Sequence, residues 1–84
     1  MNFEEAAQRV TTLSARPDNS TLLKLYSLFK QGSQGDVQGS RPGMLNVAGR
    51  AKYDAWKGLQ GMSQDDAKDK YVQLVQQLVD KDGN

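Results

Sequence analysis

Apolar residues recur at helical spacing in four stretches of the 84-residue chain. The first stretch covers residues 1–13, where apolar side chains three, four and seven positions apart form one face, as in an amphipathic helix. This face consists of Phe3, Ala6, Ala7, Val10 and Leu13. Pro17 follows closely and bars continuation, because proline cannot occupy a helix interior without breaking it. A first helix is therefore predicted to end before Pro17.

The second stretch predicts a helix with an unusually broad apolar face. It starts after a run of N-cap candidates, residues 18–21, and closes near Gln34, between Gly32 and Gly35. Its apolar residues are Leu22, Leu23, Leu25, Tyr26, Leu28 and Phe29. They span an arc of about 220°, whereas a stripe of roughly 100° is enough for a surface helix. We therefore expect this helix to lie centrally in a bundle or to contact a second apolar object.

Two further helices are predicted in the second half of the chain. The third should run from about Gly49 to Gln60 and end at Gly61, and the fourth should begin at an N-cap, Ser63. The fourth should extend to about Lys81, with residues 82–84 frayed. Valines recur in it, but at helical rather than alternating spacing. The pattern thus predicts an all-α fold of four helices without a strand.

A long interruption separates the second and third predicted helices. Its glycines and proline are Gly32, Gly35, Gly39, Pro42, Gly43 and Gly49, and no run between them is long enough for a stable helix. Connections longer than about 12–15 residues are uncommon in compact domains, and those that persist are usually functional or disordered. The loop is therefore the first place to look for function.

The composition argues against an enzyme or a metalloprotein. The chain has neither cysteine nor histidine, which excludes a disulfide, a thiolate metal site and any Ser-His or Cys-His pair. Asp65, Asp66 and Asp69 have the positions of helix-cap and surface charges, and no paired acid and base is evident. We expect a single domain over residues 1–84, without catalytic residues, metal or cofactor.

Charge and hydropathy limit the partners further. The net charge is +1, with both signs interspersed, whereas nucleic-acid binders usually show clustered basic excess. No run approaches 18 apolar residues, and two glutamates stand near the N-terminus where a signal peptide would carry lysines. We expect a cytoplasmic protein that neither binds nucleic acid nor inserts stably into membranes.

Aromatic residues and lysines gather at both ends of the long loop. Tyr26 and Lys30 precede it at i, i+4 spacing, and Lys52 and Trp56 follow it with the same spacing. Two ammonium groups beside flat rings could receive a phosphorylated aromatic group, by ion pairing and by stacking. Rings at helical spacing are, however, more often core residues, and lysines more often solvated. Spacing alone leaves both interpretations open.

The segment YSLFKQGSQGDVQGSRPGMLNVAGRAKYDAW, residues 26–56, resembles the acyl-CoA-binding proteins. The likeness rests on the Tyr-x-x-aromatic-Lys-Gln segment at 26–31, on Gly-Asp at 35–36, and on Arg-Pro-Gly-Met-Leu at 41–45. It continues with Ala-Lys at 51–52 and Asp-Ala-Trp at 54–56. Flanking residues stay in register over nearly the whole chain, so the match is far more specific than one short motif.

This resemblance implies a fold and a function. The fold would be an up-down-down-up four-helix bundle with a long loop between helices 2 and 3. The protein would bind one medium- or long-chain acyl-CoA ester without chemistry, as an intracellular monomeric carrier and pool former. The acyl chain would lie in an apolar groove, which would explain the wide arc of the second helix.

The resemblance also assigns site residues. Tyr26 and Lys30 would contact the nucleotide, with Phe29 against adenine, and Lys52 would join Lys30 at the ribose 3′-phosphate. Ser27 and Leu28 would line the same contact, and Tyr71 would close the site with its hydroxyl.

The chain departs from the usual family pattern at three positions near this site. Phe29 stands where a tyrosine is common, which keeps stacking but removes a hydroxyl. Thr11 and Ala48 stand where many members carry lysines that face the ligand. Arg16 and Arg50 are candidates to replace that charge.

Two other functions are compatible with parts of the pattern. A helical interaction module could use the broad apolar face to hold a partner's amphipathic helix, but the two lysines would then have no specific task. An acyl-CoA thioesterase or isomerase would need a base and a nucleophile, and neither is found. The carrier of acyl-CoA is the function that uses both the lysines and the apolar face.

Overall fold

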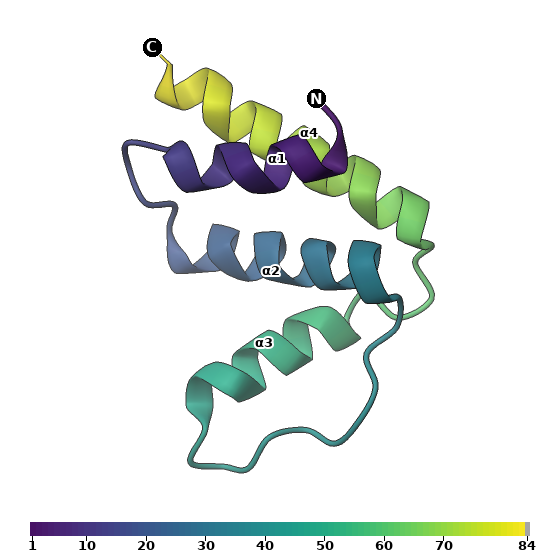
Figure 1. Ribbon diagram of the computed structural model, residues 1–84. Helices are drawn as coiled ribbons and strands as arrows, with labels where there is room; N and C mark the ends of the chain where they lie inside the picture. The colour runs from purple at the N-terminus through teal and green to yellow at the C-terminus, as the bar shows by residue number, and fades with distance from the viewer. Residues whose placement is uncertain (84) are drawn as a thin grey trace.

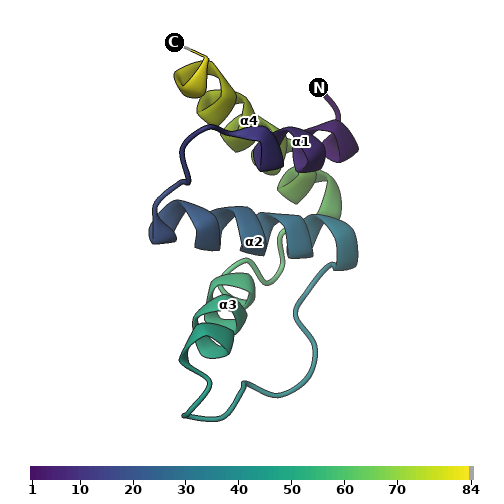
Figure 2. The ribbon, with the colours of Figure 1, turned by 60° about the vertical axis from the view of Figure 1, so that its left-hand side comes forward.

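The computed structural model describes residues 1–83, and α2, Asn19–Gln34, is the central helix of the bundle. It packs against α3, Val47–Lys57, on one side and against α4, Gln64–Asp82, on the other. Figures 1 and 2 both show α2 between α3 and the pair formed by α1, Phe3–Arg9, and α4. Two helix contacts on different sides explain the wide apolar arc of α2.

The helices follow the expected up-down-down-up order. In Figure 1, α1 and α4 run in one direction, and α2 and α3 run in the opposite one. Within residues 1–83, every regular element is helical and no strand forms, which confirms the all-α four-helix class. No helix in that range combines the length and the apolar character that a membrane span requires.

The first helix is shorter than the expected 1–13. A capping box starts it, in which Asn2 and Glu5 exchange hydrogen bonds of 2.8 and 3.1 Å between side chain and backbone N–H. The α-helix ends at Arg9 and tightens into a 3₁₀ turn over Val10–Thr12. The hydroxyls of Thr11 and Thr12 donate to carbonyls three residues earlier, at 2.7 Å each, a local bond that competes with helix geometry.

The boundaries of α2 agree with the sequence pattern. The Asp18 carboxylate accepts from the Thr21 N–H at 2.7 Å, which satisfies one of the unpaired donors of the first turn. Gly35 ends the helix with a φ of 80°, a conformation that favours glycine.

The predicted limits of the third helix, 49–60, are wrong at both ends. Asn46 caps the helix by accepting from the Gly49 N–H at 3.0 Å, so α3 begins already at Val47. At the other end, α3 stops at Lys57 and gives way to turns, in which the Leu59 N–H bonds the Trp56 carbonyl at 3.0 Å. Asparagine before a glycine-containing segment was the overlooked start signal.

The fourth helix starts where expected but ends later. Ser63 accepts from the Asp66 N–H at 3.0 Å and caps the helix. The expected fraying of residues 82 and 83 is wrong, because Asp82 is helical and accepts from the Ser14 hydroxyl at 2.6 Å and from its N–H at 3.0 Å. The Gly83 N–H bonds the Val79 carbonyl at 2.9 Å. Asn84, the third residue expected to fray, lies outside the described part of the chain.

The core joins α1, α2 and α4. Its buried apolar residues are Ala6, Leu25, Tyr71 and Val75, and partly buried side chains of the same three helices surround them. No residue of α3 is buried. The bundle therefore consists of a three-helix body with α3 attached to α2.

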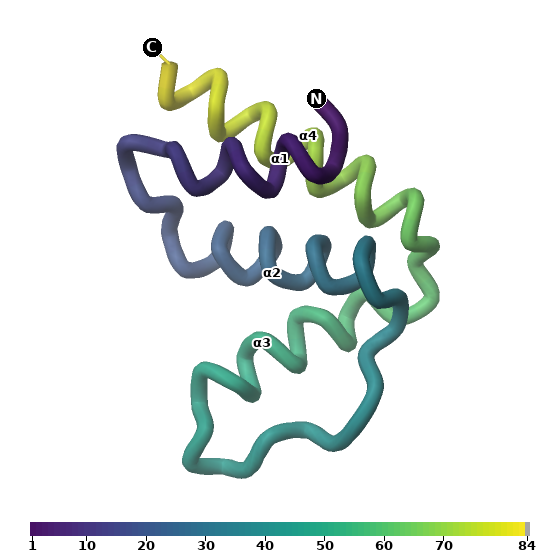
Figure 3. Tube along the Cα trace, in the orientation of Figure 1, coloured from purple at the N-terminus to yellow at the C-terminus, as the bar shows by residue number. Residues whose placement is uncertain are grey.

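The long connection from Gly35 to Asn46 has a geometric cause. Because α2 and α3 are parallel, the chain must return along their length before α3 begins, as Figure 3 shows. The 16 residues of α2 span about 24 Å at 1.5 Å per residue. About a dozen extended residues reach at most roughly 40 Å, which is enough for this return.

Three contacts tie the connection to its surroundings. Arg41 forms a two-pronged ion pair with Asp54 of α3, at 3.0 and 2.7 Å. The Tyr53 hydroxyl donates to the Gly39 carbonyl at 3.2 Å. Near the start of the loop, the Asp36 carboxylate accepts from the Gly61 N–H at 2.9 Å. The first two contacts hold the loop along α3, and the third ties its start to the turn before α4.

Candidate functional site

Two lysines from different helices approach the same aromatic ring. The Lys52 ammonium, on α3, lies 5.4 Å from the centroid of the Tyr26 ring on α2, and the Lys30 ammonium lies 5.9 Å from it. Both distances are within the range of cation–π attraction, which is worth about 0.5–1 kcal/mol at an exposed site. The structure thus brings together the lysines at the two ends of the long loop.

A second ring also lies close to the Lys30 ammonium. Its ammonium lies 5.5 Å from the centroid of the Trp56 ring on α3. The Trp56 indole N–H donates to the Gly35 carbonyl at 2.8 Å and to the Gln31 side-chain oxygen at 3.1 Å. The ring beneath Lys30 is therefore fixed by two hydrogen bonds to α2 and its C-terminus.

Gln31 is the buried centre of this network, and sequence reasoning assigned it no role. Its side chain is fully buried, and its amide nitrogen donates to the Asp36 carboxylate and to the Met62 carbonyl, at 2.8 Å each. Hydrogen bonds from Gln31 and from the Gly61 N–H lower the pKa of Asp36. Gln31 thus joins α2 to the beginning of the long loop and to the turn before α4.

The two lysines are available to an anion. Within residues 1–83, neither Lys30 nor Lys52 forms an ion pair with a carboxylate. Rings rather than acids surround both ammonium groups, so their positive charge is not neutralised by the protein. Two such groups beside one ring can bind a phosphate by charge-assisted hydrogen bonds.

An apolar groove adjoins this pair between α2 and α3. A cavity of about 410 Å³ lies there, and its apolar wall consists of Leu22, Leu23, Ala48 and Ala51. Tyr26 and Lys52 line it as well, together with Arg16. Because alanine stands at position 48, this wall is apolar where a lysine would add charge. The groove can hold an unbranched apolar chain whose polar end lies near the lysines.

A cluster of three aromatic rings lies on the neighbouring side of α2, toward α1 and α4. Phe29 stacks on Phe3 of α1 with ring centroids 5.3 Å apart, and both contact Tyr71 of α4, at 5.8 and 5.2 Å. Phe29 remains 38% exposed, whereas Tyr71 is buried, and burial raises its pKa above the ordinary value of 10.0. Lys68 adds a cation, 5.6 Å from the Phe3 centroid. The exposed part of Phe29 offers a face or an edge to a flat group.

Ser27 and Leu28, the other two residues of α2 predicted for the site, offer no free polar group to the lysine pair. Ser27 is buried, and its hydroxyl donates to the Lys24 carbonyl at 3.1 Å. Leu28 packs against the core. The structure therefore groups Tyr26, Lys30 and Lys52 on one side of α2, and Phe29 with Tyr71 on another.

Arg16 and Arg50, the candidates to replace the lysines absent at positions 11 and 48, lie in different places. Arg16 lies at the groove, as the lining of the cavity shows. Arg50 belongs to α3, and its Nε is buried without a hydrogen-bond partner among residues 1–83. Thr11 uses its hydroxyl within the 3₁₀ turn. Arg16 is thus the arginine that lies beside the predicted site.

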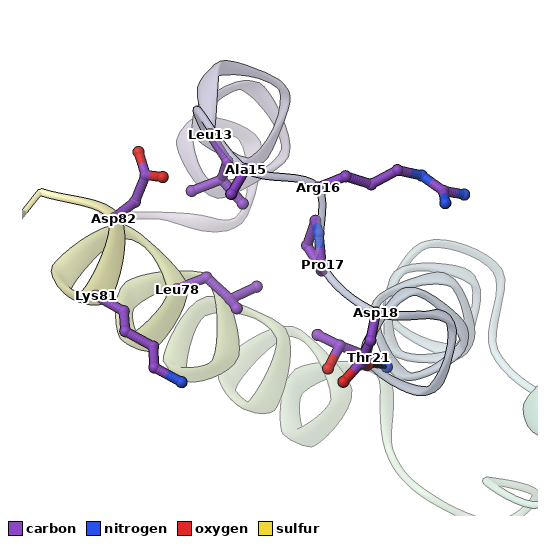
Figure 4. Close-up of a pocket in the computed structure, with 9 residues that line it drawn as sticks. All are labelled: Leu13, Ala15, Arg16, Pro17, Asp18, Thr21, Leu78, Lys81 and Asp82. Carbon is purple, nitrogen blue, oxygen red and sulfur yellow. Dashed lines mark hydrogen bonds between the residues drawn. The ribbon is translucent and has the colours of Figure 1, made fainter.

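A second cavity, of about 380 Å³, lies between the α1–α2 connection and the end of α4. Figure 4 shows its apolar lining, Leu13, Pro17 and Leu78, and shows the Arg16 side chain pointing away from it. Its two carboxylates already serve the fold, because Asp18 caps α2 and Asp82 accepts from Ser14. None of the predicted site residues lines this cavity.

The lysine pair, its neighbouring rings and the groove offer groups that can bind a ligand. Within residues 1–83, no group of three or more acidic, histidine or cysteine side chains is placed to hold a metal ion. Two cations, flat rings and an apolar groove lie next to one another in space. Such a site suits an elongated ligand with an anionic, aromatic head and an apolar tail.

Comparison with known proteins gives consistent matches. The family model described as acyl CoA binding protein matches residues 1–75. The acyl-CoA-binding protein homolog 1 of Caenorhabditis elegans is 47% identical over 83 residues, covering 99% of this chain and 96% of that protein. The acyl-CoA-binding protein of Dictyostelium discoideum is 51% identical over 79 residues, covering 94% of each chain.

Solved structures agree with the fold. The crystal structure of Oryza sativa acyl-CoA-binding protein 2 superposes with a TM-score of 0.89 at 40% identity, over 94% of this chain and 88% of that one. That of the Moniliophthora perniciosa protein gives 0.90 at 36% identity, over 98% and 81%. The sequence matches and the superpositions thus cover the same, nearly complete, length of this chain.

Proposed function

Because the chain belongs to the acyl-CoA-binding protein family, we propose that it binds one acyl-CoA ester non-covalently and carries it. The observation that carries this proposal is the pair of un-neutralised ammonium groups 5.9 and 5.4 Å from the Tyr26 ring centroid, beside an apolar groove. CoA esters have the matching order of groups: a phosphorylated nucleotide, a flexible linker and a hydrocarbon chain. A partner helix in the same groove would leave the lysines unused.

Lys30 and Lys52 bind the ribose 3′-phosphate in this proposal. Charge-assisted hydrogen bonds are roughly twice as strong as neutral ones, so two of them would fix the orientation of the nucleotide. Both ammonium groups lie near the Tyr26 ring, which adds a flat contact surface. The 3′-phosphate would then distinguish CoA esters from free fatty acids.

The adenine would use the other ring cluster. We assign Phe29 to stacking against the base, since its ring is partly exposed, and Tyr71 to the far side of the same contact, with its hydroxyl toward the ligand. Ser27 and Leu28 would support this contact from within α2. Their side chains face the protein interior, so we assign them to positioning Tyr26 and Lys30 rather than to polar recognition.

The acyl chain would occupy the groove between α2 and α3. Burial of one CH₂ group contributes about 0.8 kcal/mol, so roughly a dozen methylenes give on the order of 10 kcal/mol before ordering costs. The groove walls of leucine and alanine suit such a chain. This term favours medium- and long-chain esters over short ones.

The family is one of binding and carrier proteins, and we extend this to the present chain as a monomeric, single-domain, non-enzymatic carrier in the cytoplasm. The absence of histidine and cysteine supports a role without chemistry, since no activated nucleophile can form from them. The ligand itself is the only small molecule that the proposal needs.

Calorimetric titration with palmitoyl-CoA, free palmitate and CoA tests the proposal. We expect tight binding of the ester and much weaker binding of the acid and of CoA, because each contains only half of the recognised groups. Absence of heat with the ester, or equal affinity for free palmitate, would overturn the assignment.

A further inference from the structure

Three large apolar side chains near the start of α3 are fully or mostly exposed. Met44 is 79% exposed, Leu45 100% and Val47 74%. Single exposed apolar residues are common, but a run of three within four positions forms a patch, which we call the apolar tip. It is separate from the residues assigned to the acyl-CoA contact.

The apolar tip projects from the molecule. In both Figure 1 and Figure 2, the chain before α3 lies at the end of the molecule opposite α1 and α4. The Arg41–Asp54 ion pair fixes the preceding loop to α3, and the Asn46 cap fixes the turn between Leu45 and Val47. The tip is therefore a convex feature that the fold itself holds outward.

Positive charge accompanies the apolar tip along one face of α3. Val47, Arg50, Asp54 and Lys57 follow each other at spacings of three and four residues, which places them on one face. The pKa of Asp54 is lowered first by its hydrogen bonds from Arg41, and the charges of Arg41, Arg50 and Lys57 act in the same direction. Three cations thus surround a single carboxylate, which leaves this face positive.

The shape, size and charge of this surface favour a lipid bilayer over a protein. The patch has three side chains on a convex turn, whereas each partner in a specific protein interface buries about 800 Å² of well-fitted surface. A bilayer needs no shape complementarity. Binding to it scales with buried apolar area and with attraction between cations and anionic lipids.

We propose that the apolar tip docks this protein onto bilayers that contain anionic phospholipid, with Met44, Leu45 and Val47 among the headgroups and upper acyl chains. The cations of the α3 face, chiefly the exposed Lys57, would then lie against the lipid phosphates and carboxylates. This is peripheral contact and not insertion of a helix.

Docking in this orientation would also place the acyl groove at the bilayer. Ala48, which directly follows Val47, lines the groove. The hydrocarbon chain of a ligand could then pass between bilayer and groove with little exposure to water. This exchange role rests on the proposed function, whereas docking itself does not.

Sedimentation with vesicles tests docking without any ligand. Vesicles of phosphatidylcholine with one third phosphatidylserine should bind the unchanged protein, and pure phosphatidylcholine vesicles should bind it several-fold less. The double variant Met44→Ser/Leu45→Ser should lose about tenfold in vesicle affinity, because its apolar contact area is removed. The matched control Leu45→Met keeps an apolar side chain and should bind as the unchanged protein does.

Two further measurements make the result decisive. Arg50→Gln/Lys57→Gln should lower binding to the anionic vesicles by about tenfold and leave the weak binding to neutral vesicles unchanged. The tip variants should bind palmitoyl-CoA in solution with unchanged affinity, so a failed ligand titration would count against the proposed function and not against docking. The inference is overturned if the unchanged protein does not bind anionic vesicles, which is the result expected if the apolar tip docks a protein instead. It is also overturned if Met44→Ser/Leu45→Ser binds these vesicles as well as the unchanged protein does.

Discussion

Lys52 and Tyr26 meet across the interface of α2 and α3, with the ammonium nitrogen 5.4 Å from the ring centroid. These residues are far apart in sequence, and the long loop lies between them. The contact depends on the parallel arrangement of the two helices, because it places the first half of α3 beside the middle of α2. With Lys30 on the same ring, it defines the site at which an anion is expected.

Replacing either lysine should weaken binding of the ester. We expect Lys30→Ala and Lys52→Ala each to cost about 1.5–3 kcal/mol in binding free energy, the usual range for a hydrogen bond to a charged group. Calorimetry with palmitoyl-CoA measures this directly. Lys24→Ala, which removes an exposed lysine of the same helix outside the site, is the matched control and should leave the affinity unchanged.

The ester of dephospho-CoA identifies the group that the lysines bind. If they contact the 3′-phosphate, both lysine variants should lose little affinity for this ligand. An equal loss for both ligands would place the lysines against another part of the nucleotide.

The indole N–H of Trp56 should be important for stability. Trp56→Phe removes its bonds to Gln31 and to the Gly35 carbonyl, and leaves the buried Gln31 oxygen without this donor. We expect a loss of about 1–3 kcal/mol in the free energy of unfolding, measured by urea denaturation. Tyr53→Phe, which removes an exposed loop contact, should stay within about 0.5 kcal/mol of the unchanged protein. Equal losses would mean that burial of the Gln31 network has no special importance.

Asp36 should make stability depend on acid pH. Hydrogen bonds from Gln31 and Gly61 lower its pKa in the folded protein, so the ionised form favours folding. This contribution is fully present above the ordinary pKa of 3.8 and is lost as the pH falls through the lowered folded value. The difference in unfolding free energy between neutral pH and about pH 3 should therefore be smaller in Asp36→Asn. Asp69→Asn, outside this network, should keep the full difference.

A hydroxyl at position 29 should improve binding. Phe29→Tyr keeps the ring that stacks on Phe3 and adds a polar group at a side chain that is 38% exposed. We expect unchanged stability and a gain of about 0.5–1.5 kcal/mol in binding, the value of one hydrogen bond. Phe29→Leu should lose affinity because the flat contact disappears. Unchanged calorimetric affinity in both variants would remove Phe29 from the adenine contact.

Local signals in the sequence predicted most of the fold. The cap Ser63 and the terminating Gly35 are short-range features that residue type alone located, and the cap Asp18 was one of the four candidates at 18–21. The end of the α-helix at Arg9 was not predicted. It depends on hydrogen bonds from the Thr11 and Thr12 hydroxyls, and these bonds form only in the folded geometry.

Contacts between residues that are distant in sequence were harder to predict. The spacing of Tyr26, Lys30 and Lys52 indicated an anion site, but could not separate it from an ordinary core and surface. Gln31 carried no signal of burial, since its network forms only when the start of the loop and the turn before α4 come together. The same reason explains Asp82, whose partner Ser14 lies at the opposite end of the chain.

The attachment of α3 to α2 alone has a consequence for motion. Since α3 packs on no other helix and buries no residue, it should open more readily than the three-helix body, and its amides should exchange hydrogen fastest. A ligand that bridges Lys30 and Lys52 would suppress this opening in proportion to its occupancy. Exchange of α3 amides would then report whether the carrier is loaded, while exchange of α4 amides would report unfolding of the whole chain.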